Sequence, residues 1–159
     1  MNACAELTGL KVEEYYRLFD AGDECYGVFR DGRPVNINWI HRGSCYIRGM
    51  GYLHKGSDKD YYIYGIKTAD SEQGKGLYKN CLAEISRYLF GRRADKLIQM
   101  VEEGNAPVFH TLPKLGYNET LRIHNVTMAG LRRTIVTDIN NKRKTGRIYL
   151  KPPEGTFVI

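Results

Sequence analysis

The segment from Asp70 to Phe90, DSEQGKGLYKNCLAEISRYLF, constrains the fold of this chain more than any other part of the sequence. It predicts a helix over residues 76–90, because its apolar residues recur at steps of one, three and four. These residues are Leu77, Tyr78, Cys81, Leu82, Ile85 and Leu89. Such a wide apolar stripe must pack against another layer, so we expect a sheet beneath this helix.

The segments before this helix alternate in the manner of β-strands. Residues 24–43 predict a hairpin, because they contain an Asp-Gly turn signal followed by apolar residues that alternate with Asn36 and Asn38. We therefore expect the second strand of the hairpin to have one buried face and one polar face. Residues 60–68, DYYIYGIKT, are aromatic and β-branched, which is typical of a central strand.

The rest of the chain predicts short elements of both kinds. They are an amphipathic helix at residues 10–20, a broken extended segment at 44–54, a strand at 95–101, a short helix from 105 that Pro113 ends, and two or three antiparallel strands after 120. No internal repeat or linker is visible. We therefore expect one mixed α/β domain over residues 1–159.

Composition restricts the function only in part. With 42% hydrophobic and 26% charged residues the chain is ordinary for a globular protein, and no apolar run is long enough to cross a bilayer. Its start, MNACAELTG, lacks the pattern of a secretory signal, so we expect a cytoplasmic protein with no membrane partner. The four cysteines are scattered without a CxxC pair, so we expect no metal site.

The formal charge of +6 suits several anionic partners. Nucleic acid is one of them, and a nucleic-acid-binding module is therefore one alternative. The basic residues are dispersed and are not interleaved with aromatic residues, which disfavours that alternative. No sequence feature specifies the oligomeric state, so a homodimer stays open.

A glycine pair, Gly74 and Gly76, stands at the start of the predicted helix. The first N–H groups of a helix have no partner within it, so a strand-loop-helix junction is a natural phosphate site, and glycine lets ligand oxygens reach the backbone. The loop is not a P-loop, because no Ser or Thr follows Lys75. It is not a dinucleotide fingerprint either, because Lys79 stands where the third glycine is needed.

A third pattern matches. The loop Gln73-Gly74-Lys75-Gly76-Leu77 resembles the Arg/Gln-x-x-Gly-x-Gly/Ala loop of the GCN5-related N-acetyltransferases. Downstream, NAPVFHTLPKLGY resembles the Asn-led helix of that family, which ends in Leu-Gly-Phe or Leu-Gly-Tyr. The resemblance covers residues 60–128. It implies an α/β fold with a mixed, mostly antiparallel central sheet flanked by helices, in which two strands splay apart at the cofactor slot.

The resemblance also implies an acyl-CoA-dependent N-acyltransferase, with acetyl-CoA as the expected cofactor and a direct transfer to an amine acceptor. In this family the pyrophosphate lies on the amides of the glycine loop, the pantetheine arm pairs with the preceding strand, and the asparagine contacts the cofactor from the other side. The corresponding residues here are Gln73, Gly74, Lys75, Gly76 and Leu77 for the pyrophosphate, Ile66, Lys67 and Thr68 for pantetheine, and Asn105.

The sequence departs from the family at the catalytic positions. Leu112 replaces the tyrosine that protonates the thiolate, and Met100 replaces the carboxylate that accepts the amine proton. The nearest catalytic candidates are Glu102 and Tyr64. Because the usual acid and base are missing, a non-catalytic domain that binds CoA or another ligand stays open as an alternative.

Two further departures concern structure. Tyr78 stands where the family loop has a small residue. The family usually begins with a strand, and here that strand is either absent or poorly matched by NACAELTG. No motif specifies the acceptor or the acyl length.

Overall fold

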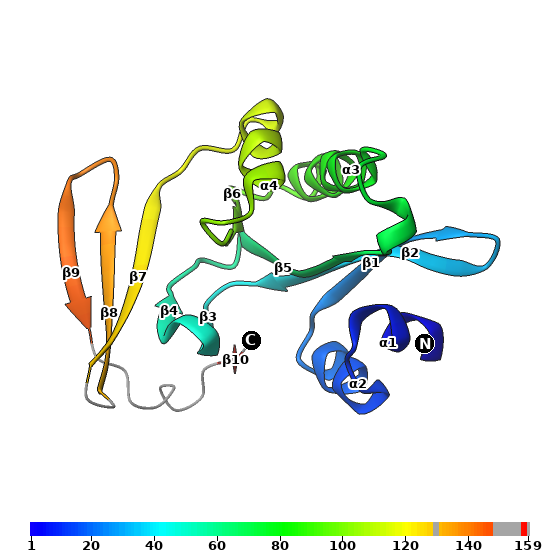
Figure 1. Cartoon of the computed structure of the whole chain (residues 1–159), viewed down its shortest axis with the longest axis horizontal. Coiled ribbons are helices and arrows are strands. Elements are labelled where there is room, and N and C mark those ends of the chain that lie inside the picture. The colour runs from blue at the N-terminus through cyan, green and yellow to red at the C-terminus, as the bar shows by residue number, and fades with distance from the viewer. Residues whose placement is uncertain (129–130, 148–156, 159) are drawn as a thin grey trace. The chain divides into compact units, whose positions relative to one another are not determined.

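The computed structural model describes residues 1–128, 131–147 and 157–158, which lie in two compact units. The first unit contains Met1–Gly43 and Gly56–Leu115, and the second contains Ser44–Lys55 and Gly116–Ile159. In the first unit, helices cover both faces of a sheet (Figure 1). No helix in the described ranges is both long enough and apolar enough to span a bilayer.

The first unit begins with two helices, α1 (Asn2–Thr8) and α2 (Val12–Asp20). α2 agrees with the predicted amphipathic helix. α1 shows that the first residues are helical and do not form the strand with which the family usually begins. It ends at Gly9, whose φ of 72° lies in the left-handed region that favours glycine. The Tyr15 hydroxyl donates to the Cys4 carbonyl oxygen at 3.0 Å and so joins the two helices.

Four strands form the sheet of the first unit, in the order β1-β2-β5-β6. They are β1 (Glu24–Arg30), β2 (Arg33–Arg42), β5 (Asp60–Thr68) and β6 (Lys96–Gln99). β2 pairs antiparallel with both β1 and β5, whereas β5 and β6 are parallel. The mixed, mostly antiparallel sheet is therefore confirmed. β6 ends two residues earlier than predicted.

The predicted hairpin is also confirmed. The turn between β1 and β2 has positive φ at Asp31 (50°) and Gly32 (75°). A type I′ turn needs positive φ at both central residues, and its twist matches that of the flanking strands. The local Asp-Gly signal therefore determines the register in which β1 meets β2.

The predicted polar face of β2 is wrong. Asn36 and Asn38 are 0% exposed, because this face lies under α3 (Leu77–Gly91). Asn38 Nδ2 donates to Asn36 Oδ1 at 2.6 Å and to Cys81 Sγ at 3.1 Å, and Asn36 Nδ2 donates to Thr68 Oγ1 at 2.9 Å. Burial raises the pKa of the Cys81 thiol, so the network is uncharged at neutral pH.

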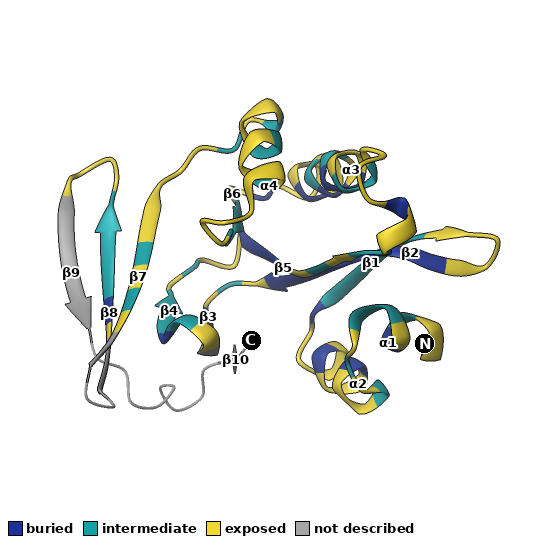
Figure 2. Ribbon diagram, in the orientation of Figure 1, coloured by how far each residue is buried: buried dark blue, intermediate teal, exposed yellow. Residues whose placement is uncertain are grey.

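α3 covers the sheet face opposite α1 and α2 (Figure 1). The buried residues lie mainly in the central strands and on the inward side of α3 (Figure 2). Four members of the predicted stripe are buried, namely Cys81, Leu82, Ile85 and Leu89, while Leu77 and Tyr78 are half-buried. The pattern of the helix therefore correctly identified the residues that pack on the sheet.

We expect Leu82→Ala to lower the free energy of unfolding by about 2–5 kcal/mol, because it leaves a cavity at a fully buried position. Urea denaturation followed by circular dichroism measures the difference. Lys79→Ala, at an exposed position of the same helix, is the control and should change stability by less than about 0.5 kcal/mol. Equal stability of the Leu82→Ala variant and the wild type would contradict this packing.

The second unit contains two small sheets. One has the order β10-β3-β4, with β3 (Cys45–Ile47), β4 (Tyr52–His54) and β10 (Phe157–Val158). The other is the antiparallel meander of β7 (Leu121–Met128), β8 (Leu131–Asp138) and β9 (Arg143–Arg147). This meander confirms the antiparallel strands predicted after residue 120. Part of the predicted third strand, residues 148–156, lies outside the described residues.

A polar contact holds β7 and β8 to the turn η1 (Arg48–Met50), which lies between β3 and β4. Thr134 Oγ1 lies 3.0 Å from the Met50 carbonyl oxygen and 2.9 Å from Asn125 Oδ1. Gly51, with a φ of 59°, brings the backbone close to Thr134, since a Cβ there would lie 3.2 Å from Thr134 Oγ1. These contacts all lie within the second unit.

Candidate functional site

One edge of β5 is open along its second half. β5 and β6 are paired from Asp60 with Lys96 to Ile63 with Gln99, and β6 then ends while β5 continues to Thr68. Within the described residues, no strand pairs with this edge of β5 beyond Ile63. β5 therefore extends beyond the end of β6, and the backbone groups on this edge of β5 lack a strand partner.

The open half of β5 begins with a β-bulge. Between the pairs Trp39 with Tyr64 and Ile37 with Lys67, two residues of β5 lie opposite one residue of β2. The first of the two is Gly65, whose φ is 55°. A Cβ at this position would lie 3.1 Å from Trp39 Cδ1. Both the backbone conformation and the contact with Trp39 therefore favour glycine here.

The direction of the backbone N–H and C=O groups shows which residues of β5 present them at the open edge. The Ala69 N–H donates to the Val35 carbonyl oxygen at 2.9 Å, so the backbone groups of residue 69 point toward β2. Alternate residues of a strand point to opposite edges. The backbone groups of Lys67 therefore also point toward β2, whereas those of Ile66 and Thr68 point to the open edge. Of the three residues predicted for pantetheine, two present backbone groups to the open edge of β5.

The predicted glycine loop lies between β5 and α3 and is open to solvent. Gly74 and Gly76 have φ values of 73° and 75°, and no atom lies within 4 Å of a Cβ added to either. The amide N–H groups of Gly74, Lys75, Gly76 and Leu77 have no acceptor among the described residues. The Gln73 N–H instead donates to the Asp70 carbonyl oxygen at 3.3 Å. Four of the five predicted loop amides are therefore available.

Positive charge accompanies these amides. Glu72 is buried, and its Oε1 lies 2.7 Å from Arg30 Nη1 and 3.3 Å from Lys75 Nζ. Two cations thus share one carboxylate. Both basic side chains are more than half exposed and face solvent at the loop, where Gln73 Nε2 also donates to the Asp70 carboxylate at 2.9 Å. An anion near the α3 N-terminus is favoured both by the charge and by the helix dipole.

Asn105 and Glu102 lie beyond the end of β6. Asn105 is the N-cap of α4 (Ala106–Thr111), and its Oδ1 accepts the Val108 N–H at 3.4 Å. The Glu102 carbonyl oxygen accepts the Asn105 N–H at 2.9 Å. The Glu102 side chain is exposed, and its carboxylate has no hydrogen bond or ion pair among the described residues. The structure therefore links Glu102 to Asn105 through the backbone alone.

Tyr64 belongs to a buried polar network that the sequence did not reveal. Its hydroxyl donates to Asp23 Oδ2, and Asp23 Oδ1 lies 2.7 Å from His41 Nδ1. Tyr64 pairs with Trp39, whose ring lies 5.0 Å from that of Tyr15 in α2, so the network is on the α2 side of the sheet. No local pattern marks Asp23 or His41, because strand pairing brings them to Tyr64.

Tyr78 makes a second contact at the point where β6 ends beside β5. Its hydroxyl donates to Gln99 Oε1 at 3.0 Å, and Gln99 pairs with Ile63. Since Ile63 and Tyr64 are successive residues of one strand, Gln99 lies on the α3 side of the sheet and Tyr64 on the α2 side. A tyrosine hydroxyl therefore lies on each face of the sheet near the end of β6. The unusual Tyr78, which follows the glycine loop as the second residue of α3, was the only sequence signal for this contact.

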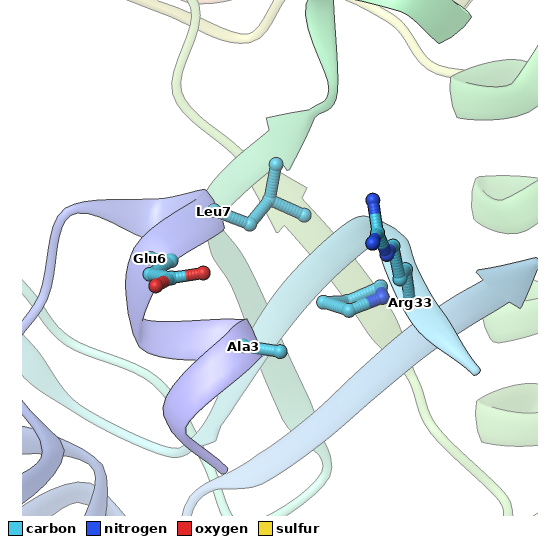
Figure 3. Close-up of a pocket in the computed structure, with 5 residues that line it drawn as sticks. Ala3, Glu6, Leu7 and Arg33 are labelled. Carbon is cyan, nitrogen blue, oxygen red and sulfur yellow. The ribbon is translucent and has the colours of Figure 1, made fainter.

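A separate depression of about 510 Å³ lies between α1 and the start of β2. Its lining consists of Ala3, Glu6, Leu7, Arg33 and Pro34 (Figure 3). None of the residues predicted to bind the cofactor lines this depression. The open edge of β5 and the glycine loop, rather than this depression, are therefore the candidate site.

Comparisons with known proteins agree with this architecture. No protein-family model matches the sequence, and no curated protein does. Solved structures do match. The aminoglycoside N-acetyltransferase AAC(6')-Iy in complex with CoA has a TM-score of 0.63 at 16% identity, and a Trypanosoma brucei acetyltransferase has 0.59 at 18%; each match covers 80% of this chain and 92% of the other.

A third match widens the range of enzymes with this architecture. Glucosamine-6-phosphate N-acetyltransferase from Arabidopsis thaliana has a TM-score of 0.51 at 14% identity, and the match covers 78% of this chain and 85% of that one. Together with the mixed central sheet flanked by helices, these matches identify the architecture: the chain has the fold of the GCN5-related N-acetyltransferases.

Proposed function

We propose that this protein is an acyl-CoA-dependent N-acyltransferase that transfers an acyl group, in the simplest case acetyl, directly to an amine. One observation supports this most strongly: an open strand edge lies next to a helix N-terminus with unpaired, solvent-exposed amides. Acyl-CoA has the two matching parts, a diphosphate and an amide-containing arm. The open strand edge and the glycine loop follow one another along the protein chain, just as the amide-containing arm and the diphosphate follow one another in acyl-CoA.

The diphosphate fits the glycine loop. The amides of Gly74, Lys75, Gly76 and Leu77 would donate to its oxygens, and the Lys75 ammonium would add charge. Glycine at positions 74 and 76 leaves the backbone accessible, because no side chain stands between the amides and solvent. The backbone N–H of Gln73 already donates to the Asp70 carbonyl oxygen, so we assign to Gln73 the role of closing the preceding turn.

The pantetheine arm fits the open edge of β5. Its amides would pair with the outward backbone groups of Ile66 and Thr68, as an added strand does. Lys67 would contribute through its exposed side chain, since its backbone faces β2. Asn105 lies at the start of α4, beyond the end of β6, and would contact the arm from that side.

The structural neighbours support this assignment of the ligand. AAC(6')-Iy was solved with CoA and with a bisubstrate analogue of CoA and acetylneamine. Both complexes are of an N-acetyltransferase with the same fold as this chain. A common fold does not fix the acceptor, so the amine is proposed here only as a chemical class.

Titration calorimetry with acetyl-CoA tests the cofactor site. We expect wild-type protein and Thr68→Val to bind, and Thr68→Pro to bind about tenfold more weakly, because proline removes the N–H that faces the slot. Thr68→Val is the matched control, since it also loses the hydroxyl that accepts from Asn36 but keeps the N–H. No binding of acetyl-CoA or longer acyl-CoAs to the wild type would refute the proposal.

A non-catalytic CoA-binding domain is the alternative, and Leu112 and Met100 at the usual acid and base positions favour it. Release of free CoA thiol in the presence of primary amines separates the two. Thiol release that depends on the amine supports transfer. Binding of acetyl-CoA without such release supports the alternative.

A further inference from the structure

Asp23 is a buried carboxylate with an unusual set of partners. Its side chain is 0% exposed, and within the described residues neither lysine nor arginine forms an ion pair with it. One oxygen lies beside His41 Nδ1 and the other accepts the Tyr64 hydroxyl. A buried carboxylate without a permanent cation is costly, so such a group is often kept for its chemistry.

The position of this network is informative. Tyr64 is the first residue of β5 beyond the last pair with β6, and it directly precedes the glycine of the bulge. It is half-buried, whereas Asp23 and His41 behind it are buried. A phenol at the opening of the slot is thus joined through Asp23 to an imidazole in the interior.

We propose that Tyr64 accepts the amine proton during acyl transfer and passes its own proton to Asp23, which His41 holds in place. This inference rests on the proposed function. The ammonium gives a proton to the Tyr64 oxygen as the phenolic proton moves to Asp23 Oδ2. The amine nitrogen then forms a bond to the thioester carbon and gives its second proton to water, and the C–S bond breaks. Its electron pair leaves with the CoA sulfur, which takes a proton from water.

The network explains how the chain can manage without a carboxylate at Met100. An alkylammonium has a reference pKa of about 10, so transfer at neutral pH needs a proton acceptor. Glu102 is exposed and has no partner that would orient its carboxylate. Tyr64, in contrast, is oriented by the hydrogen bond that its hydroxyl donates to the Asp23 carboxylate. In this scheme Tyr64 is the catalytic residue, and Asp23 and His41 are positioning residues that act through it.

Two amines of nearly equal size provide the sharpest test. Ethylamine is an ammonium ion at neutral pH, whereas the fluorines of trifluoroethylamine lower its basicity enough to keep it neutral. The protein is given acetyl-CoA and one amine at a time, and the release of free CoA is measured for these two amines and for a broader panel of primary amines. We expect Tyr64→Phe and Asp23→Asn to lower kcat with ethylamine by about 10²-fold or more, and to leave the acetyl-CoA KM unchanged. With trifluoroethylamine both variants should keep most of the wild-type rate.

Tyr62→Phe is the matched control, because Tyr62 lies two residues away on the same face and its ring stacks on that of Tyr64 at 5.8 Å. It should behave as the wild type with both amines. Denaturation curves establish which variants fold. If Asp23→Asn does not fold, Tyr64→Phe alone decides, since it removes one hydroxyl and no ring packing.

Equal losses with both amines, or no loss with either, would overturn the relay. Wild-type protein that binds acetyl-CoA but acylates no amine would also overturn it, while leaving the cofactor site intact. Failure of acetyl-CoA to bind would remove the proposed function itself. The calorimetric and kinetic results therefore separate the two failures.

Discussion

Gly65→Val is expected to lower the free energy of unfolding by about 2–4 kcal/mol and to abolish measurable acetyl-CoA binding. The loss of stability has two causes. Gly65 has a φ of 55°, where a β-branched residue is strained, and its Cβ would meet Trp39 Cδ1 at 3.1 Å. Trp39 cannot move away, because it is 0% exposed and packs on Tyr15 and Phe19.

The loss of binding follows from the register. If the bulge relaxes to regular pairing, the backbone beyond it shifts by one residue relative to β2. The backbone groups of Ile66 and Thr68 would then both turn toward β2 and away from the slot. Urea denaturation and calorimetry, the latter at a temperature where the variant is folded, measure the two effects separately.

Gly91→Ala is the control for Gly65→Val. Gly91 is the last residue of α3, no atom lies within 4 Å of an added Cβ, and its φ is ordinary. Alanine there should raise stability by up to about 1 kcal/mol and leave binding unchanged. Wild-type affinity in a folded Gly65→Val variant would show that the bulge does not shape the cofactor site.

The elements with strong local signals were predictable. The hairpin turn, α3 and the glycine loop each depend on the identity of neighbouring residues, and each lies where the sequence indicated. Asn105 is an example of a local signal with two uses. Its side chain caps α4, as expected for an asparagine at the N-cap position. Its predicted contact with the cofactor stays a proposal.

The features that depend on distant contacts were not predictable. Asn36 and Asn38 look solvent-exposed in the sequence, because alternation with apolar residues normally indicates a polar outer face. Only the placement of α3 over β2 buries them, and distant residues, among them Cys81 and Thr68, accept from their side-chain N–H groups. The same reason applies to Asp23, which a local analysis reads as a residue of the turn before β1.

Gly76→Val is expected to weaken acetyl-CoA binding by about tenfold or more, because the loop amides would leave their orientation and each charge-assisted hydrogen bond contributes roughly 1.5–3 kcal/mol. Gly76 has a φ of 75° and no steric neighbour, so strain in the backbone is the only cause of the altered loop conformation.

Gly9→Val is the matched control, since Gly9 has a φ of 72° and equally open surroundings at the end of α1. Both variants should lose about 1–2 kcal/mol of stability, but only Gly76→Val should lose affinity. S-acetylpantetheine, which lacks the diphosphate, should bind both variants and the wild type equally. A parallel loss for acetyl-CoA and S-acetylpantetheine would mean that the loop holds something other than the diphosphate.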